Sequence, residues 1–148
     1  MEKDKKVGFA ADHAGFSYKK ELMEFLNKEG YSMLEDFGTH NEESCDYADF
    51  VHPLADAVAN HKLDFGIVIC GSGNGVNITA NKHDGVRSAL CWNSEVAELA
   101  RGHNNANICA IPARFISVEL AKEIIFRFLH TEFEGGRHER RIEKIENF

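Results

Sequence analysis

The strongest constraint on the fold is an unbroken apolar run that ends in a glycine-rich turn. Residues 64–70 (Asp-Phe-Gly-Ile-Val-Ile-Cys) show no alternation of polar and apolar side chains, and residues 71–75 follow as Gly-Ser-Gly-Asn-Gly. A strand that is apolar on both faces belongs inside a parallel sheet that helices cover on both sides. The run therefore predicts the central strand of an α/β fold.

The rest of the chain continues this alternation of strands and helices. Apolar runs predict four further strands, at residues 6–11, 31–37, 86–92 and 107–111. Helical periodicity predicts helices at residues 16–29, 48–61, 94–102 and 117–130, with a shorter one from the glycine turn to residue 82. Because Pro53 falls inside one of these patterns, we expect that helix to start later than residue 48.

Five strands between helices in a chain of 148 residues predict a single domain over residues 1–148. We expect a three-layer α/β/α sandwich with a five-stranded parallel sheet (Rossmann-like), and a charged C-terminal tail from about residue 131. Such sheets bind ligands at the carboxyl ends of their strands. This rule selects two segments, residues 12–15 (Asp-His-Ala-Gly) and residues 70–75 (Cys-Gly-Ser-Gly-Asn-Gly).

The glycine turn is the more informative of the two segments. Its glycines allow the backbone to turn tightly and to aim N–H groups at an anion, beside the start of a helix. It lacks the lysine of a P-loop and the spacing of a dinucleotide fingerprint. The glycines alone do not indicate a ligand site, because a plain strand-to-helix turn has them too. Cys70 is the stronger indication of a reactive site, because the start of a helix stabilises a thiolate.

Other candidate residues have structural alternatives. Cys91 and Cys109 lie in predicted strands and fit a buried structural role, whereas Cys45 stands among acidic residues. His13 either binds a ligand or pairs with Asp12 within its loop. The three arginines of residues 135–141 suit a phosphate group, although a solvated tail has the same composition.

Composition excludes several classes of function. The formal net charge of -7 disfavours a nucleic-acid partner. The four cysteines are scattered and no metal-ligand spacing such as H-E-x-x-H is present, so we expect no disulfide framework, metal or other cofactor. No signal-peptide core or bilayer-spanning run is visible, which predicts a cytoplasmic protein without a membrane partner.

Seven short motifs, in order along the chain, resemble type B ribose-5-phosphate isomerase, whose wider family includes allose- and galactose-6-phosphate isomerases. The resemblance covers essentially the whole chain. The motifs are Asp12-His13-Ala14-Gly15, Asp46-Tyr47, the segment 70–75, Ala80-Asn81-Lys82, His103-Asn104, Pro112-Ala113-Arg114 and Gly135-Gly136-Arg137-His138.

The resemblance implies a role for each matching residue. Cys70 is the base that moves a proton between C1 and C2 of the sugar, and His103 opens the sugar ring with help from Asp12. The enediolate oxygen is held by the turn, through Gly71, Gly73, Asn74, Gly75 and the hydroxyl of Ser72. Tyr47 and Asn104 contact sugar hydroxyls. The phosphate is surrounded by His13, Arg114, Arg137 and Arg141.

Three positions depart from the pattern of many relatives. Some members lack the cysteine and carry a glutamate after the glycine turn. This chain has Val76 at that position, so the mechanism with a cysteine base is the one available. Ser72 stands where many members have a threonine, which keeps the hydroxyl. Asn105 replaces an aspartate, which removes a negative charge near His103 and leaves the protonation of that histidine open.

The resemblance implies an aldose–ketose isomerase of ribose 5-phosphate and ribulose 5-phosphate, assembled as a homodimer or a dimer of dimers. The alternatives are an isomerase of a six-carbon sugar phosphate, a nucleotide-binding module and a non-catalytic partner subunit. Cys70 ends a strand whereas His103 precedes one, so the two lie at opposite sheet edges, about 17–20 Å apart. We therefore expect each active site to combine residues of two subunits.

Overall fold

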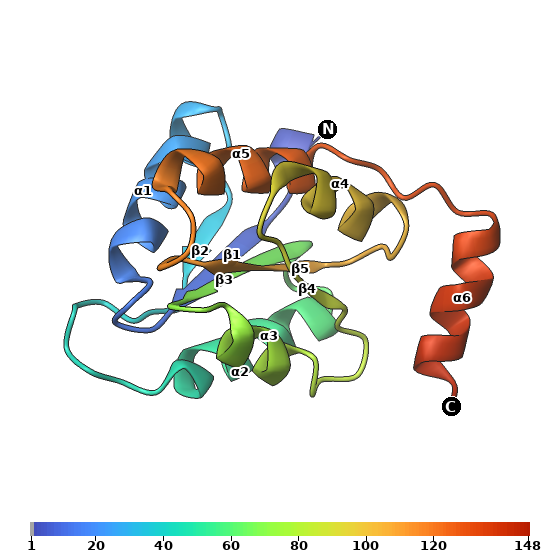
Figure 1. The fold of residues 1–148 in the computed structure, drawn as a ribbon, viewed down its shortest axis with the longest axis horizontal. Helices are drawn as coiled ribbons and strands as arrows, with labels where there is room; N and C mark the ends of the chain where they lie inside the picture. The colour runs from blue at the N-terminus through green and yellow to red at the C-terminus, as the bar shows by residue number, and fades with distance from the viewer. Residues whose placement is uncertain (1) are drawn as a thin grey trace.

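A five-stranded parallel sheet forms the centre of the protein in the computed structural model, which describes residues 2–148 (Figure 1). The strands are β1 (Val7–Ala11), β2 (Leu34–Asp36), β3 (Phe65–Cys70), β4 (Ser88–Leu90) and β5 (Ile108–Pro112). They lie in the order β2-β1-β3-β5-β4, and each neighbouring pair is parallel. The predicted α/β class and five-stranded parallel sheet are confirmed.

Helices cover both faces of this sheet. They are α1 (Phe16–Lys28), α2 (Tyr47–Ala59), α3 (Asn74–Ala80), α4 (Ser94–Gly102), α5 (Val118–Leu129) and α6 (Arg137–Glu146), after a short 3-10 turn η1 (Glu2–Asp4). Figure 1 shows α1, α4 and α5 on one face and α2 and α3 on the other, while α6 stands apart from these layers. None of the helices in residues 2–148 is both long and apolar enough to cross a bilayer.

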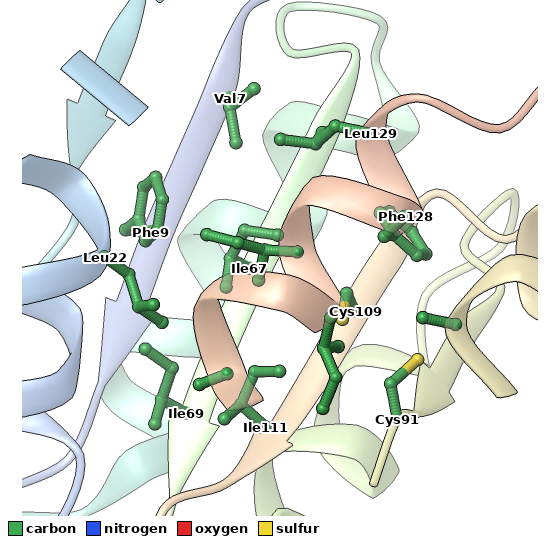
Figure 2. Close-up of a cluster of buried hydrophobic side chains, with 14 of the residues drawn as sticks. Val7, Phe9, Leu22, Ile67, Ile69, Cys91, Cys109, Ile111, Phe128 and Leu129 are labelled. Atoms are coloured by element: carbon green, nitrogen blue, oxygen red, sulfur yellow. The ribbon is translucent and has the colours of Figure 1, made fainter. Parts of the chain in front are cut away.

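The central strands bury side chains on both faces, which explains their continuous apolar sequences. Ile67 and Ile69 of β3 pack with Leu22 of α1 and Phe128 of α5 in one cluster (Figure 2). Alternate side chains of β3 point to the opposite face, so Val68 and Cys70 belong to a second buried cluster, with α2 and α3. The thiol of Cys70 therefore lies on the α2–α3 side of the sheet.

Four segments differ from the sequence predictions. The edge strands β2 and β4 are shorter than the strands predicted at 31–37 and 86–92, although backbone hydrogen bonds to the neighbouring strand continue at Met33, Phe37 and Cys91. The helix α2 begins at Tyr47 and contains Pro53 well inside it, so the expected later start is wrong. Pro53 is exposed, where water can bond the carbonyl that proline leaves without a partner. The expected tail contains the helix α6.

Candidate active site

A surface pocket of about 460 Å³ lies at the carboxyl ends of β1, β3 and β5. It brings together eight of the residues that the sequence singled out and adds Ala14 and the exposed ring of Phe115. The predicted residues that line it are Asp12, His13, Tyr47, Cys70, Gly71, Ser72, Gly75 and Arg114. The pocket is therefore where a parallel α/β sheet places its ligand site.

The loop after β1 is fixed by the carboxylate of Asp12. One oxygen of Asp12 accepts the N–H groups of Ala14 at 2.9 Å and of Gly15 at 3.1 Å, in a turn that aspartate favours. A Cβ on Gly15 would come within 2.6 Å of the Ile69 carbonyl oxygen, so this glycine allows the loop to lie directly against β3. As a result, Asp12 and His13 are held beside the end of the strand that carries Cys70.

The glycine turn is tied to the neighbouring strand β5. The carbonyls of Cys70 and Gly71 accept the N–H groups of Ala113 and Arg114, each at 2.9 Å. The turn is completed by Gly73, whose φ of 77° is a left-handed conformation that glycine adopts at no steric cost. The thiol of Cys70 is consequently held at a fixed place, with only 5% of the residue exposed.

Two side chains close over the glycines of this turn. A Cβ on Gly75 would overlap the ring of Tyr47, and a Cβ on Gly71 would lie 3.1 Å from Cδ of Arg114. The hydroxyl of Ser72 accepts the Asn74 N–H at 3.2 Å. Gly73 and Asn74 therefore shape the turn without lining the pocket, whereas Gly71, Ser72 and Gly75 face it.

The tautomer of His13 follows from its hydrogen bond. Its Nδ1 accepts the backbone N–H of Cys45 at 3.3 Å, so the proton of the neutral ring is placed on Nε2. An imidazole in that state can donate Nε2–H to an anion. A basic side chain, Arg114, lines the same pocket, so the two residues give it the donors that a phosphate group requires.

A second group of predicted residues lies at the opposite edge of the sheet. His103 follows α4 and precedes the amino end of β5, whereas Cys70 is paired with Pro112 at the carboxyl end of that strand. Arg137 and Arg141 belong to α6, where both side chains are exposed. Asn104 is exposed beside His103, with its carbonyl accepting Nε of Arg87 at 3.0 Å. None of these four predicted residues lines the pocket of Cys70.

His103 sits in a cluster with two residues to which the sequence assigned no role. Its ring stacks on that of His138, with centroids 4.1 Å apart and an interplanar angle of 15°. Both imidazoles approach the carboxylate of Glu134, His103 Nε2 at 3.5 Å and His138 Nε2 at 3.8 Å. The resemblance contained His138 in a motif, but Glu134 is an acidic residue in a charged segment and gave no sequence signal.

This cluster offers three ligand-type atoms within 4.8 Å of one another. A metal ion lies in the plane of each imidazole that binds it, along the lone pair of the nitrogen. Two nearly parallel rings stacked at 4.1 Å cannot both direct their lone pairs at a single ion. The arrangement fits a shared counter-charge better than a metal centre.

Fold and pocket together define a small α/β protein with a polar ligand site at the carboxyl ends of its strands. Residues 7–145 match the family described as Ribose/Galactose Isomerase. The chain is 41% identical over 141 residues to ribose-5-phosphate isomerase B of Escherichia coli, across 95% of this chain and 94% of that protein. It belongs to the Ribose/Galactose Isomerase family.

Solved structures of relatives have the same fold. Ribose-5-phosphate isomerase B of Clostridium thermocellum superposes with a TM-score of 0.93 at 48% identity, over 95% of each chain. The corresponding enzyme of Mycoplasma genitalium, determined with bound ribulose 5-phosphate, gives a TM-score of 0.91 at 40% identity. That match covers 95% of this chain and 93% of the other. The agreement extends over nearly the whole chain, so the chain is a sugar-phosphate aldose–ketose isomerase.

Proposed function

We propose that the protein interconverts ribose 5-phosphate and ribulose 5-phosphate through an enediolate, with Cys70 as the base. The observation that carries the proposal is the placement of Cys70 in the pocket, beside a glycine turn and together with Asp12. The relative from Mycoplasma genitalium that holds ribulose 5-phosphate supports the choice of a five-carbon substrate.

The chemistry follows from these groups. The thiolate of Cys70 takes the proton from C2 of the open-chain aldose, the electron pair of that bond forms the C1–C2 double bond, and the carbonyl oxygen becomes an oxyanion. Donors of the turn at Gly71 and Ser72 stabilise that oxyanion as it forms. Return of the proton from Cys70 to C1, with transfer of the O2 proton to the oxyanion at O1, gives the ketose. His13 and Arg114 hold the phosphate.

The second group completes the site from another subunit. In this proposal the protein is a homodimer or a dimer of dimers, and His103, Asn104, Arg137 and Arg141 reach the pocket of the partner. The separation of the two groups across the sheet supports it, as does the position of α6 outside the layers (Figure 1). Large apolar side chains exposed on α3, after β4 and on α4 offer contact surface, namely Ile78, Trp92 and Leu99. His103 then opens the ring of the neighbouring sugar, assisted by Asp12.

The cysteines bear on where such an enzyme works. All four are free, and Cys70, Cys91 and Cys109 are buried. Reduced thiols persist in a reducing compartment, which supports a cytoplasmic location.

Turnover of the purified chain on ribose, allose and galactose phosphates tests the proposed reaction. We expect the highest kcat/KM with ribose 5-phosphate. Cys70→Ala should lower kcat by at least about 100-fold, because a positioned base contributes that much or more. The matched control is Cys91→Ala, which removes a buried thiol from the other side of the sheet and should leave kcat unchanged. Near-normal turnover by Cys70→Ala would contradict the assignment.

A further inference from the structure

A carboxylate that is distant in sequence lies beside the ring of His103. Asn105, two residues after His103, carries no charge, and its side-chain oxygen accepts Nη1–H of Arg101 at 2.9 Å. The negative charge beside His103 comes instead from Glu134, whose Oε2 lies 3.5 Å from His103 Nε2. Glu134 therefore supplies the charge that Asn105 lacks.

The backbone holds Glu134 in this place. Its N–H donates to the carbonyl of Gly102, the last residue of α4, at 3.0 Å. A Cβ on Gly102 would approach Oε2 of Glu134 to 3.0 Å, so the glycine leaves the room that the carboxylate occupies. The segment before α6 is thus fixed against the end of α4, where His103 begins the next loop.

The two stacked rings cannot both be protonated at low cost. They lie 4.1 Å apart and share one carboxylate, so a second proton would place two positive charges in contact. The other charged groups near the pair are Arg137 and Arg141 of α6, while Arg101 of α4 turns toward Asn105 and the carbonyl of Ala106. The pair is therefore a site for a single proton.

Burial decides which ring holds that proton. His138 is 5% exposed, and its Nε2 is buried without a hydrogen-bond partner in the described chain. Burial lowers the pKa of His138, with further lowering by His103 and Arg137, and Glu134 opposes the shift only in part. The side chain of His103 is 36% exposed and stands nearer to the carboxylate.

We propose that Glu134 and His138 are positioning residues that fix a single proton on His103. The carboxylate stabilises the imidazolium of His103, and the neutral His138 ring beneath it sets the plane of His103 and takes no charge. This inference rests on the proposed function where it gives the proton a use: a protonated His103 is the acid that ring opening requires. The geometry of the cluster itself does not depend on that use.

The direct test follows each imidazole by NMR in substrate-free protein with labelled histidine, across pH 5 to 9. In the native chain His103 should gain its proton at a higher pH than His138. Glu134→Gln should move the protonation of His103 to lower pH, because it removes the opposite charge whose oxygen lies 3.5 Å from His103 Nε2. The matched control Glu132→Gln removes the same charge from an exposed position two residues away and should leave the pKa of His103 unchanged. His138→Phe, which keeps a stacked ring, should also leave it nearly unchanged.

Kinetics provide a readout that a purely structural role would not move. If His103 acts as the acid, kcat/KM of Glu134→Gln should fall below the native value at alkaline pH and match it at acid pH, where His103 is protonated in both proteins. A loss that is equal at every pH, a His103 pKa unaffected by Glu134→Gln, or a His138 that gains its proton first would each overturn the inference. A different result would show that the proposed function is wrong. If His103 has no part in the reaction, His103→Ala should isomerise ribose 5-phosphate at the native rate, whatever the NMR titration shows.

Discussion

Two inactive variants should restore activity to each other when they share a dimer. Within one chain the distance between Cys70 and His103 is set by β5, since Cys70 pairs with Pro112 and the register runs back to Ile108 at the amino end. Four residue steps of a parallel strand span about 13 Å, and His103 lies five residues further back. A five-carbon sugar cannot contact both side chains across that span. Cys70→Ala and His103→Ala therefore each damage both sites of a dimer, but they damage different halves of each site.

The expected magnitude follows from the two-fold symmetry. A mixed dimer carries one doubly damaged site and one site with both native residues. Random pairing makes about half the dimers mixed, so refolding equal amounts of the two variants together should return about a quarter of native activity. The assay is turnover of ribose 5-phosphate, with affinity tags on one variant to show that mixed dimers form. A mixture that contains mixed dimers and remains as inactive as either variant alone would refute the shared site.

The remaining predictions concern single residues. Arg137→Ala should raise KM for ribose 5-phosphate at least tenfold and leave the weak turnover of unphosphorylated ribose unchanged, which steady-state kinetics of both sugars would check. Gly15→Ala should lower the melting temperature by several degrees, because the new Cβ meets the backbone of β3. The control Gly85→Ala places its Cβ where nothing lies within 4 Å, so it should lower the free energy of unfolding by only about 1 kcal/mol, for the left-handed φ. Asp36→Asn should destabilise the fold by about 2–3 kcal/mol in urea unfolding, because it leaves the ammonium of Lys19, 2% exposed, without the negative charge that now lies 2.6 Å away.

The fold was predictable because its central strands are buried on both faces. Apolar runs such as Ile67-Val-Ile69 do not alternate, and only helices on both sides of a parallel sheet account for them. The limits of β2 and β4 were not predictable, since nothing in the sequence marks where the regular ladder ends: Met33, Phe37 and Cys91, just outside these strands, still hydrogen-bond to β1 or β5. The helix α6 was not predicted because too few of its residues are apolar. It buries only His138 and Ile142 among charged residues, so it shows no wide apolar face.

The site was predictable in the part that one sheet edge assembles. The rule that ligands bind at the carboxyl ends of parallel strands placed Asp12 and Cys70 in one pocket, as the structure has them. No comparable rule links Glu134 to His103, because their contact depends on the path of the chain between α5 and α6. A carboxylate that acts across 31 positions of sequence leaves no spacing to recognise.

The position of α6 connects these findings. This helix carries the arginines assigned to the phosphate and the histidine that stacks on His103, yet it stands outside the layered body, with an ion pair between Arg87 and Glu146 at its far end (Figure 1). A helix with so narrow a buried face gains little stability from its own chain. On the proposed dimer, the neighbouring subunit supplies the missing contacts and receives the arginines in its pocket. Binding of phosphate, placement of the His103 proton and association of the subunits would then depend on the same short helix.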